Sequence, residues 1–247
     1  MKQLHFLSTL GIAFILFLSS CGGNEKKTDT AVTESTTIHT DSTTTPATAE
    51  STVSTTPENV LIVWQKVADF AKWKAVYDTY DSARLASGIH SFIIGRDVDD
   101  SNMVLVATKV DDVAKAKAFA NSPGLKAAMK KGGVLGMPLV AINTVVYQDN
   151  AKNMSDLRSM TMFTVKDWDA WKKSFESSRQ LREDNGLTDR AYGYDADNNH
   201  KVTLVLGIND TAKANVFWKS DVLKQKRAES GVVGEVKRHV YRVVQKY

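Results

Sequence analysis

The sequence predicts an α+β protein in which two tandem βαββαβ repeats fold together as one unit. Shifted by 98 residues, positions 60–148 align with 158–246 without a gap, and 23 of the 89 aligned pairs are identical. Each copy alternates short apolar, β-branched runs with amphipathic helical segments. One face of each sheet would lie on its own helices, and the twin copy would cover the other face. Two copies indicate a fused dimer, because a solenoid needs at least three repeats.

The first copy begins with the run Val-Leu-Ile-Val-Trp-Gln-Lys, which predicts a strand over 60–66. Apolar residues at helical spacing predict a helix over 69–87, with Asp69 placed to cap its start and Gly88 to end it. Two strands joined by a polar turn, two short helices and a final strand follow, over 89–96, 103–109, 111–121, 123–131 and 138–147.

The second copy repeats this order. Its strands are expected over 158–164, 187–194, 201–207 and 236–245, and its helices over 167–185, 210–220 and 221–230. Helices on one face of an antiparallel sheet in the order βαββαβ define the ferredoxin-like motif.

The repeated residues resemble the dimeric α+β barrel superfamily, which includes antibiotic-biosynthesis-monooxygenase-like domains. Three motifs carry the resemblance: Val-x-Asp-(Phe/Trp)-x-x-Trp-Lys at 67–74 and 165–172, Asp-x-Ala-Lys-Ala-x-x-Phe at 112–119 and 210–217, and Gly-Val-x-Gly at 133–136 and 231–234. The resemblance implies a tandem pseudo-dimer closed into one α+β barrel. It also implies a pocket between sheet and helices, which the monooxygenases of this superfamily use with haem or without a cofactor.

The N-terminus carries a second, independent signal. Lys2 precedes an apolar stretch over 6–18, which is too short to span a membrane and is typical of a secretory signal peptide. The sequence Leu-Ser-Ser-Cys that ends at Cys21 resembles the lipobox of bacterial lipoproteins. The resemblance implies a signal peptide over 1–21, acylation of Cys21 by palmitate or a similar chain, and, because Gly22 is not Asp, sorting to the outer membrane.

The next segment has the composition of a flexible tether. Seventeen of the thirty residues in 28–57 are Ser or Thr, and none is aromatic, so the segment cannot bury enough apolar surface to offset its ordering entropy. The predicted organisation is therefore a signal peptide over 1–21, a tether over 22–57, repeat 1 over 58–148 and repeat 2 over 149–247. Cys21 is the only cysteine, so no disulfide is expected, and the net charge of +4 without a Lys/Arg run argues against nucleic acid as a partner.

The repeated Trp73 and Trp171 have two interpretations, as core anchors of the first helix or as pocket walls. The repeated Arg84 and Arg182 would cap a helix end and form surface pairs, or would clamp an anion. No metal-ligand motif and no catalytic motif is present, so no metal site is expected. The side chains that we consider candidates for a ligand pocket are Trp64, Trp73, Tyr77, His90, Asn143, Trp171, Tyr192 and His239.

Three functions are compatible with these features. The leading hypothesis is a non-catalytic lipoprotein, anchored in the outer membrane through Cys21, that binds a small apolar or aromatic ligand or another envelope component, with no cofactor and as a monomer. The alternative is a cofactor-free or haem-binding monooxygenase-like enzyme, supported by the unduplicated His90 and His239. The third is a purely structural interaction module with a filled core.

Overall fold

The structure is a computed structural model that describes residues 52–151 and 155–247. Cys21, the predicted signal peptide and residues 22–51 of the predicted tether lie outside the described residues. The described strands are β1 (Val53–Ser54), β2 (Glu58–Val67), β3 (Ile89–Asp97), β4 (Met103–Val110), β5 (Val134–Asp149), β6 (Leu157–Val165), β7 (Leu187–Asp195), β8 (Asn198–Ile208) and β9 (Val232–Lys246). The helices are α1 (Phe70–Thr79), α2 (Asp81–Ala86), α3 (Val113–Asn121), α4 (Pro123–Lys131), α5 (Trp168–Ser177), α6 (Arg179–Asp184), α7 (Thr211–Trp218) and α8 (Asp221–Glu229). None of the helices in this described part is long and apolar enough to cross a membrane.

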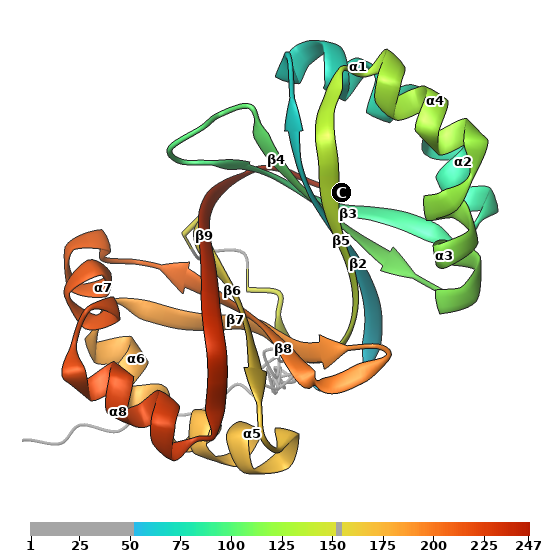
Figure 1. The fold of residues 1–247 in the computed structure, drawn as a ribbon. Helices are drawn as coiled ribbons and strands as arrows, with labels where there is room; N and C mark the ends of the chain where they lie inside the picture. Colours follow the sequence, from blue (N-terminus) through green and yellow to red (C-terminus); the bar gives the residue numbers. More distant parts are fainter. Residues whose placement is uncertain (1–51, 152–154) are drawn as a thin grey trace, which may run out of the picture. The chain divides into compact units, whose positions relative to one another are not determined.

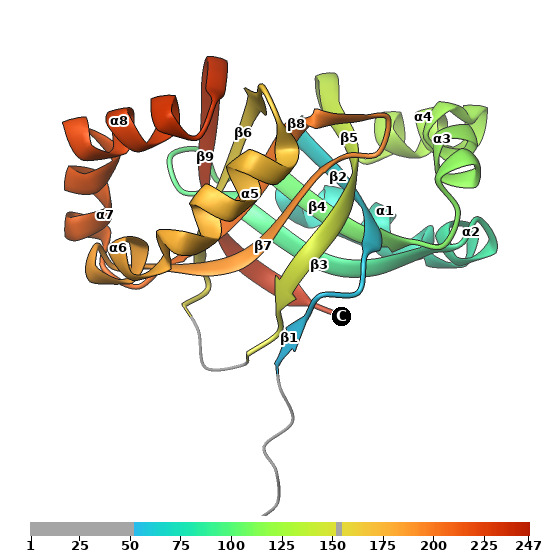
Figure 2. The same cartoon turned by 90° about the horizontal axis from the view of Figure 1, so that it is seen from below.

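The strands form one antiparallel sheet in the order β1-β5-β2-β4-β3-β9-β6-β8-β7, which closes into a barrel because β5 also pairs with β7. Strands β2–β5 belong to repeat 1 and β6–β9 to repeat 2, so the final strand of each repeat joins the other repeat. Helices α1–α4 cover the outside of the repeat 1 strands, and α5–α8 cover those of repeat 2 (Figures 1 and 2). The α+β fold is therefore a tandem pseudo-dimer, as the repeat predicts.

The two seams between the repeats have the same register. Gly95 pairs with Val243 in the β3–β9 seam, and Gly193 pairs with Val145, at the equivalent position, in the β5–β7 seam. A Cβ on Gly193 would lie 2.1 Å from the Thr144 carbonyl oxygen, and one on Gly95 would lie 2.4 Å from the Tyr241 ring. Both seams therefore need a glycine for the strands to approach this closely.

Alternate residues of each strand point to opposite sides of the barrel wall. On β2, Val60, Ile62 and Trp64 belong to the cluster inside the barrel, whereas Leu61 and Val63 pack under the helices of repeat 1. The protein thus has an inner core shared by the repeats and a separate outer core under each helical layer.

The long helix expected over 69–87, and its counterpart over 167–185, are each broken into two. The breaks fall at Tyr80 and Ser178, where the backbone leaves helical geometry. The break releases the carbonyl group of Tyr77, which accepts a hydrogen bond from Arg84 Nη1 at 2.6 Å, and Arg182 bonds the Phe175 carbonyl in the same way. At each break the carbonyl group keeps only a shorter backbone bond, from the Tyr80 and Ser178 amides, and the repeated arginine adds a second hydrogen bond to it.

The last strand of each repeat begins earlier than predicted, at Val134 instead of 138 and at Val232 instead of 236. Gly136 and Pro138 disfavour a regular strand at this point. Strand β5 nevertheless includes both residues, because its pairing with β2 shifts register there, between Trp64 and Lys66. A β-bulge is a position at which a sheet accepts Gly and Pro. In addition, β1 lies within the segment predicted as a tether and pairs with the end of β5.

Candidate functional site

In the part of the chain that the structure describes, three cavities are lined by side chains from several strands of the sheet. The barrel cavity, inside the ring of strands, has a volume of about 300 Å³. The repeat 1 pocket lies between the sheet and the helices of repeat 1, with about 310 Å³, and the equivalent repeat 2 pocket has about 100 Å³. Of these three, the barrel cavity and the repeat 1 pocket reach the lower end of the size range of small-molecule sites. A more open depression of about 400 Å³ lies on the surface beside α7, α8 and the start of β9.

The repeat 1 pocket has predominantly apolar walls. They include Val76 and Met129 from the helices and Leu61, Ile89 and Val106 from the strands. Its rim is also apolar, with Met137 96% exposed and Val140 49% exposed. Two buried polar atoms on the walls, Thr108 Oγ1 and Arg84 Nε, have no hydrogen-bond partner among the described residues.

Two stacked aromatic rings line this pocket. Trp73 is 4% exposed, and its ring centroid lies 5.2 Å from that of Tyr77. Tyr77 makes two further contacts. The Arg84 guanidinium lies 3.7 Å from its ring centroid, and its hydroxyl shares a 2.8 Å hydrogen bond with the Ser91 hydroxyl. Burial raises the pKa of Tyr77. Trp73 is therefore both a core anchor and part of a pocket wall.

The repeat 2 pocket is smaller because larger side chains fill it. Trp218 and Arg238 stand where repeat 1 has Ala120 and Val140. The Arg238 guanidinium lies 4.3 Å from the centroid of a Trp218 ring, and burial lowers its pKa to about 10. The same backbone thus holds a pocket in one repeat and a filled core in the other.

Repeat 2 also contains a buried ion pair. Arg182 donates to both carboxylate oxygens of Asp189, at 2.7 and 2.6 Å, and both residues are at most 5% exposed. The equivalent residues of repeat 1 are Arg84 and Ser91, so only repeat 2 neutralises its arginine with a buried carboxylate. The predicted capping role of these arginines is confirmed, and both guanidinium groups are buried. Arg84 pairs with the half-exposed Asp81 at 3.0 Å, as the expected surface pairing implies, whereas Arg182 pairs with the buried Asp189 instead.

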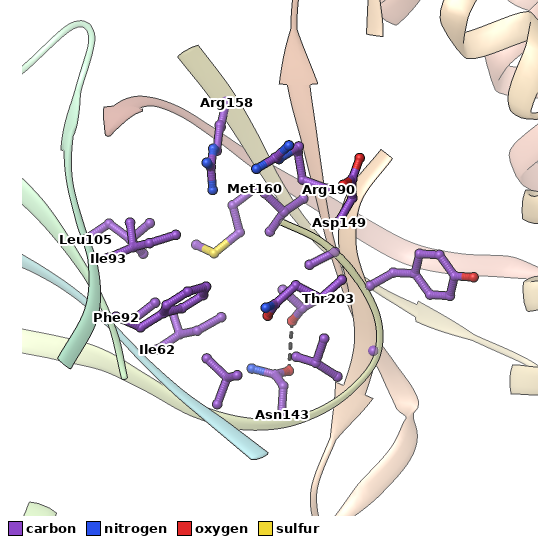
Figure 3. Close-up of a pocket in the computed structure, with 18 of the residues that line it drawn as sticks. Ile62, Phe92, Ile93, Leu105, Asn143, Asp149, Arg158, Met160, Arg190 and Thr203 are labelled. Atoms are coloured by element: carbon purple, nitrogen blue, oxygen red, sulfur yellow. Dashed lines mark hydrogen bonds between the residues drawn. The ribbon is translucent and has the colours of Figure 1, made fainter. Parts of the chain in front are cut away.

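The barrel cavity combines aliphatic walls with a few buried polar side chains (Figure 3). Arg158 of β6 and Arg190 of β7 lie at one side, and Asn143 of β5 and Thr203 of β8 at the other. Thr203 Oγ1 donates a 2.9 Å hydrogen bond to Asn143 Oδ1.

The eight candidate residues from the sequence do not form one site. Trp73 and Tyr77 line the repeat 1 pocket, Trp171 lines the repeat 2 pocket, and Asn143 lines the barrel cavity. Tyr192 borders the barrel cavity, but its ring packs in the outer core of repeat 2 against Trp171 and Phe175.

The other three lie outside these linings. The Trp64 and His239 rings are in contact inside the barrel, with centroids 4.6 Å apart and planes tilted by 40°. His90 is on the surface, 2.9 Å from Asp111.

Arg158 and Arg190 are the residues that sequence reasoning missed. The aligned repeats hold the signal: Val60 and Phe92 occupy the equivalent positions, so an inward-facing apolar residue is replaced by arginine twice. Reading the substitutions between the repeats, rather than their identities, would have found both.

The described residues contain no group of three or more His, Cys, Asp and Glu side chains close enough together to hold a metal ion.

Neither a protein-family profile nor a curated protein sequence matches the chain. Solved structures do match. An anthrone oxidase-like protein superimposes with a TM-score of 0.57 at 12% identity, covering 79% of this chain and 95% of the other. A protein described as a candidate chlorite dismutase gives 0.51 at 13% identity, with 77% and 96% covered. A haem-binding protein from Thermus thermophilus gives 0.46 at 11%, with 78% and 94% covered.

The first two similarities, together with the strand order, establish the fold class. The protein has the ferredoxin-like, dimeric α+β barrel architecture, with both halves of the pseudo-dimer on one chain. At such identities they define a fold shared by proteins of different function.

Proposed function

We propose that this protein is a lipoprotein of the outer membrane, anchored through Cys21, that binds a small apolar or aromatic ligand without catalysis. The observation that carries the binding proposal is the asymmetry between the repeats. Repeat 1 keeps a pocket of about 310 Å³, whereas repeat 2 fills the equivalent space with Trp218 and Arg238. Apolar walls with a few convergent polar atoms are typical of small-molecule sites.

The chemistry of the walls favours binding over catalysis. The titratable side chains that line the repeat 1 pocket are Tyr77, Tyr80, Arg84 and Lys126. General acid–base chemistry at neutral pH works best with a group that titrates near 7. Burial moves the pKa of Tyr77 away from that range. We therefore assign the pocket to ligand capture.

The binding proposal is tested by giving repeat 1 the residues of repeat 2. Full-length protein extracted from its native membrane is analysed by native mass spectrometry and an absorbance scan, alongside the variants Val140→Arg and Ala120→Trp. We expect a bound mass in the wild type that both variants lose. The matched control, Arg238→Val, alters only the repeat 2 pocket and should retain the ligand.

A bare wild-type chain that gains no mass from a lipid extract would reject ligand binding and favour a structural interaction module. Retention of the ligand by Val140→Arg and Ala120→Trp would place the ligand elsewhere.

The anchor is tested separately. Cys21→Ser should abolish incorporation of labelled palmitate and move the protein from the outer-membrane fraction to the soluble fraction. Ser20→Ala keeps the cysteine and should leave both unchanged. Unaltered labelling of Cys21→Ser would reject the lipid anchor. An anchor at Cys21 would hold the protein at a membrane, where other envelope proteins and apolar ligands are available. We expect it to act as a monomer, because both halves of the pseudo-dimer are on one chain.

A monooxygenase-like enzyme is the second candidate, and the stacked Trp73 and Tyr77 rings favour it as a platform for an aromatic substrate. Haem is the cofactor that this fold suggests, but the repeat 1 pocket does not fit it. None of the described histidines lines the pocket: His90 pairs with Asp111, His200 bonds the Val165 carbonyl, and the His239 ring contacts Trp64. The Tyr77 hydroxyl is bonded to Ser91 and has a raised pKa, which opposes a tyrosinate ligand.

The remaining form of this candidate is a cofactor-free oxygenase. Oxygen uptake on addition of anthrone, present in the wild type and lost in Val140→Arg, would establish it. Equal background uptake in the two proteins would reject it.

A further inference from the structure

The barrel cavity is a second space, independent of the repeat 1 pocket. The two have no lining residue in common, because alternate residues of each strand face opposite sides of the wall. At one end the cavity is lined by Lys246 and Tyr247, which are about half exposed, so a ligand can enter there.

Two arginines are buried in this cavity, although its other walls are largely aliphatic. Arg158 is 5% exposed and Arg190 is 6% exposed. The equivalent residues of repeat 1, Val60 and Phe92, line the same cavity, so the pseudo-symmetry is broken by charge. Burying a charged group is costly unless it is paired.

The surroundings of Arg158 leave its charge without a matching carboxylate. Its guanidinium bonds the hydroxyl of the fully buried Tyr241, and its Nε has no hydrogen-bond partner. Within 52–151 and 155–247, no carboxylate lies within ion-pair distance of Arg158.

Arg190 adds to this positive field. Its Nη1 donates to the Ala151 carbonyl at 3.3 Å. Burial and the nearby Arg158 lower its pKa, and Asp149 opposes that shift. Lys246, the other cation on the wall, is paired with Asp156 at 2.9 Å. Asp156 also lies in the field of Arg158, but it is bonded to Lys246 and does not line the cavity. Among the lining side chains, Arg158 and Arg190 face the one carboxylate of Asp149, which leaves about one positive charge.

The opposite side of the cavity offers a single buried donor. Asn143 is 2% exposed, and its Nδ2 has no hydrogen-bond partner, while its Oδ1 is held by Thr203. Between this amide and the arginines lie apolar side chains from both repeats (Figure 3), including Ile62, Leu105 and Met160.

We propose that the barrel cavity binds a small monocarboxylate with an apolar body. Its carboxylate lies at the guanidinium groups of Arg158 and Arg190, where the planar fork of arginine matches carboxylate geometry. The apolar body lies along the aliphatic walls toward Asn143. One net positive charge and a volume of about 300 Å³ select a single carboxylate on a short chain over a polyanion.

Octanoate is the test probe, and octan-1-ol is its uncharged counterpart. Binding is measured by calorimetric titration of the full-length protein in detergent, with each probe kept below the concentration at which it forms micelles. Octanoate should bind at least about tenfold more tightly than octan-1-ol, since hydrogen bonds to charged groups are stronger than those between neutral groups. Arg158→Met should reduce octanoate affinity by at least about tenfold and leave octan-1-ol binding unchanged. Val140→Arg, which closes the repeat 1 pocket, should bind octanoate as the wild type does.

A second variant covers the case in which Arg158→Met does not fold. Ala107→Leu fills the cavity from its apolar side and keeps both arginines, so it should also weaken octanoate binding. Equal affinity for octanoate and octan-1-ol, or unchanged octanoate binding in Arg158→Met, would overturn the proposal. Loss of octanoate binding in Val140→Arg alone would move the site to the repeat 1 pocket.

Discussion

Truncating the two repeated tryptophans compares the cores of the two repeats directly. Trp73 is 4% exposed and Trp171 is 3% exposed, so both substitutions by alanine remove a buried indole. Removal of a large aromatic side chain from a core costs about 3–5 kcal/mol of unfolding free energy. For a unit of this size that lowers Tm by about 6–20 °C, at about 2–4 °C per kcal/mol.

The neighbouring rings predict a difference between the two variants. Trp73 has two ring partners, at 5.2 and 5.8 Å, and Trp171 has four, at 5.0 to 6.1 Å. Each aromatic pair contributes about 0.5–1.5 kcal/mol beyond area burial, so Trp171→Ala should cost about 1–3 kcal/mol more than Trp73→Ala.

Urea unfolding followed by far-UV circular dichroism measures both losses without relying on tryptophan fluorescence. A single transition is expected for each protein, because the barrel joins the two repeats at both seams. A loss below about 1 kcal/mol for Trp73→Ala would refute its burial as a core anchor. Equal losses in the two variants would refute the argument from ring partners.

Two further predictions concern buried polar groups. Asp189→Ala leaves the Arg182 guanidinium buried without its carboxylate and should lower the unfolding free energy by about 3–5 kcal/mol. The double variant Asp189→Leu with Arg182→Met removes both charges and should be close to neutral. A loss below about 1 kcal/mol for Asp189→Ala in urea unfolding would refute this prediction. Burial lowers the pKa of His239 in the folded protein below 6.5, the ordinary value that the unfolded chain keeps. Between these two pKa values the unfolded chain binds more protons than the folded protein. Stability should therefore fall as the pH falls through this window. His239→Gln should flatten that part of the stability profile, and an unchanged slope would contradict the assignment.

Much of the fold could be predicted because local patterns encode it. The strand and helix order follows from period-2 and helical spacing, and Asp69 caps α1 by accepting from the Lys72 amide, as its position indicates. The breaks at Tyr80 and Ser178 could not be predicted from spacing, since they depend on an arginine that reaches back to a carbonyl group across the turn.

The candidate site was only partly predictable. The sequence gives the aromatic and histidine residues of each copy but not the side of the barrel wall to which each side chain belongs. Trp73 and Tyr77 line a pocket between sheet and helices, whereas His90 lies on the surface with Asp111. Identities between the repeats do not point to Arg158 and Arg190, because these are positions where the repeats differ.

By itself, the sequence determined the duplication, the βαββαβ order and the pseudo-dimeric fold class, because gapless repetition and periodicity are one-dimensional properties. The tertiary structure decided three further features: closure through the β5–β7 and β3–β9 seams, the unequal pockets of the two repeats, and the burial of Arg158 beside Arg190. These depend on pairing between distant strands and on how side-chain volumes and charges meet in space. Two nearly equivalent halves therefore hold different cavities, since substitutions such as Val140 against Arg238 change a pocket without changing the backbone that frames it.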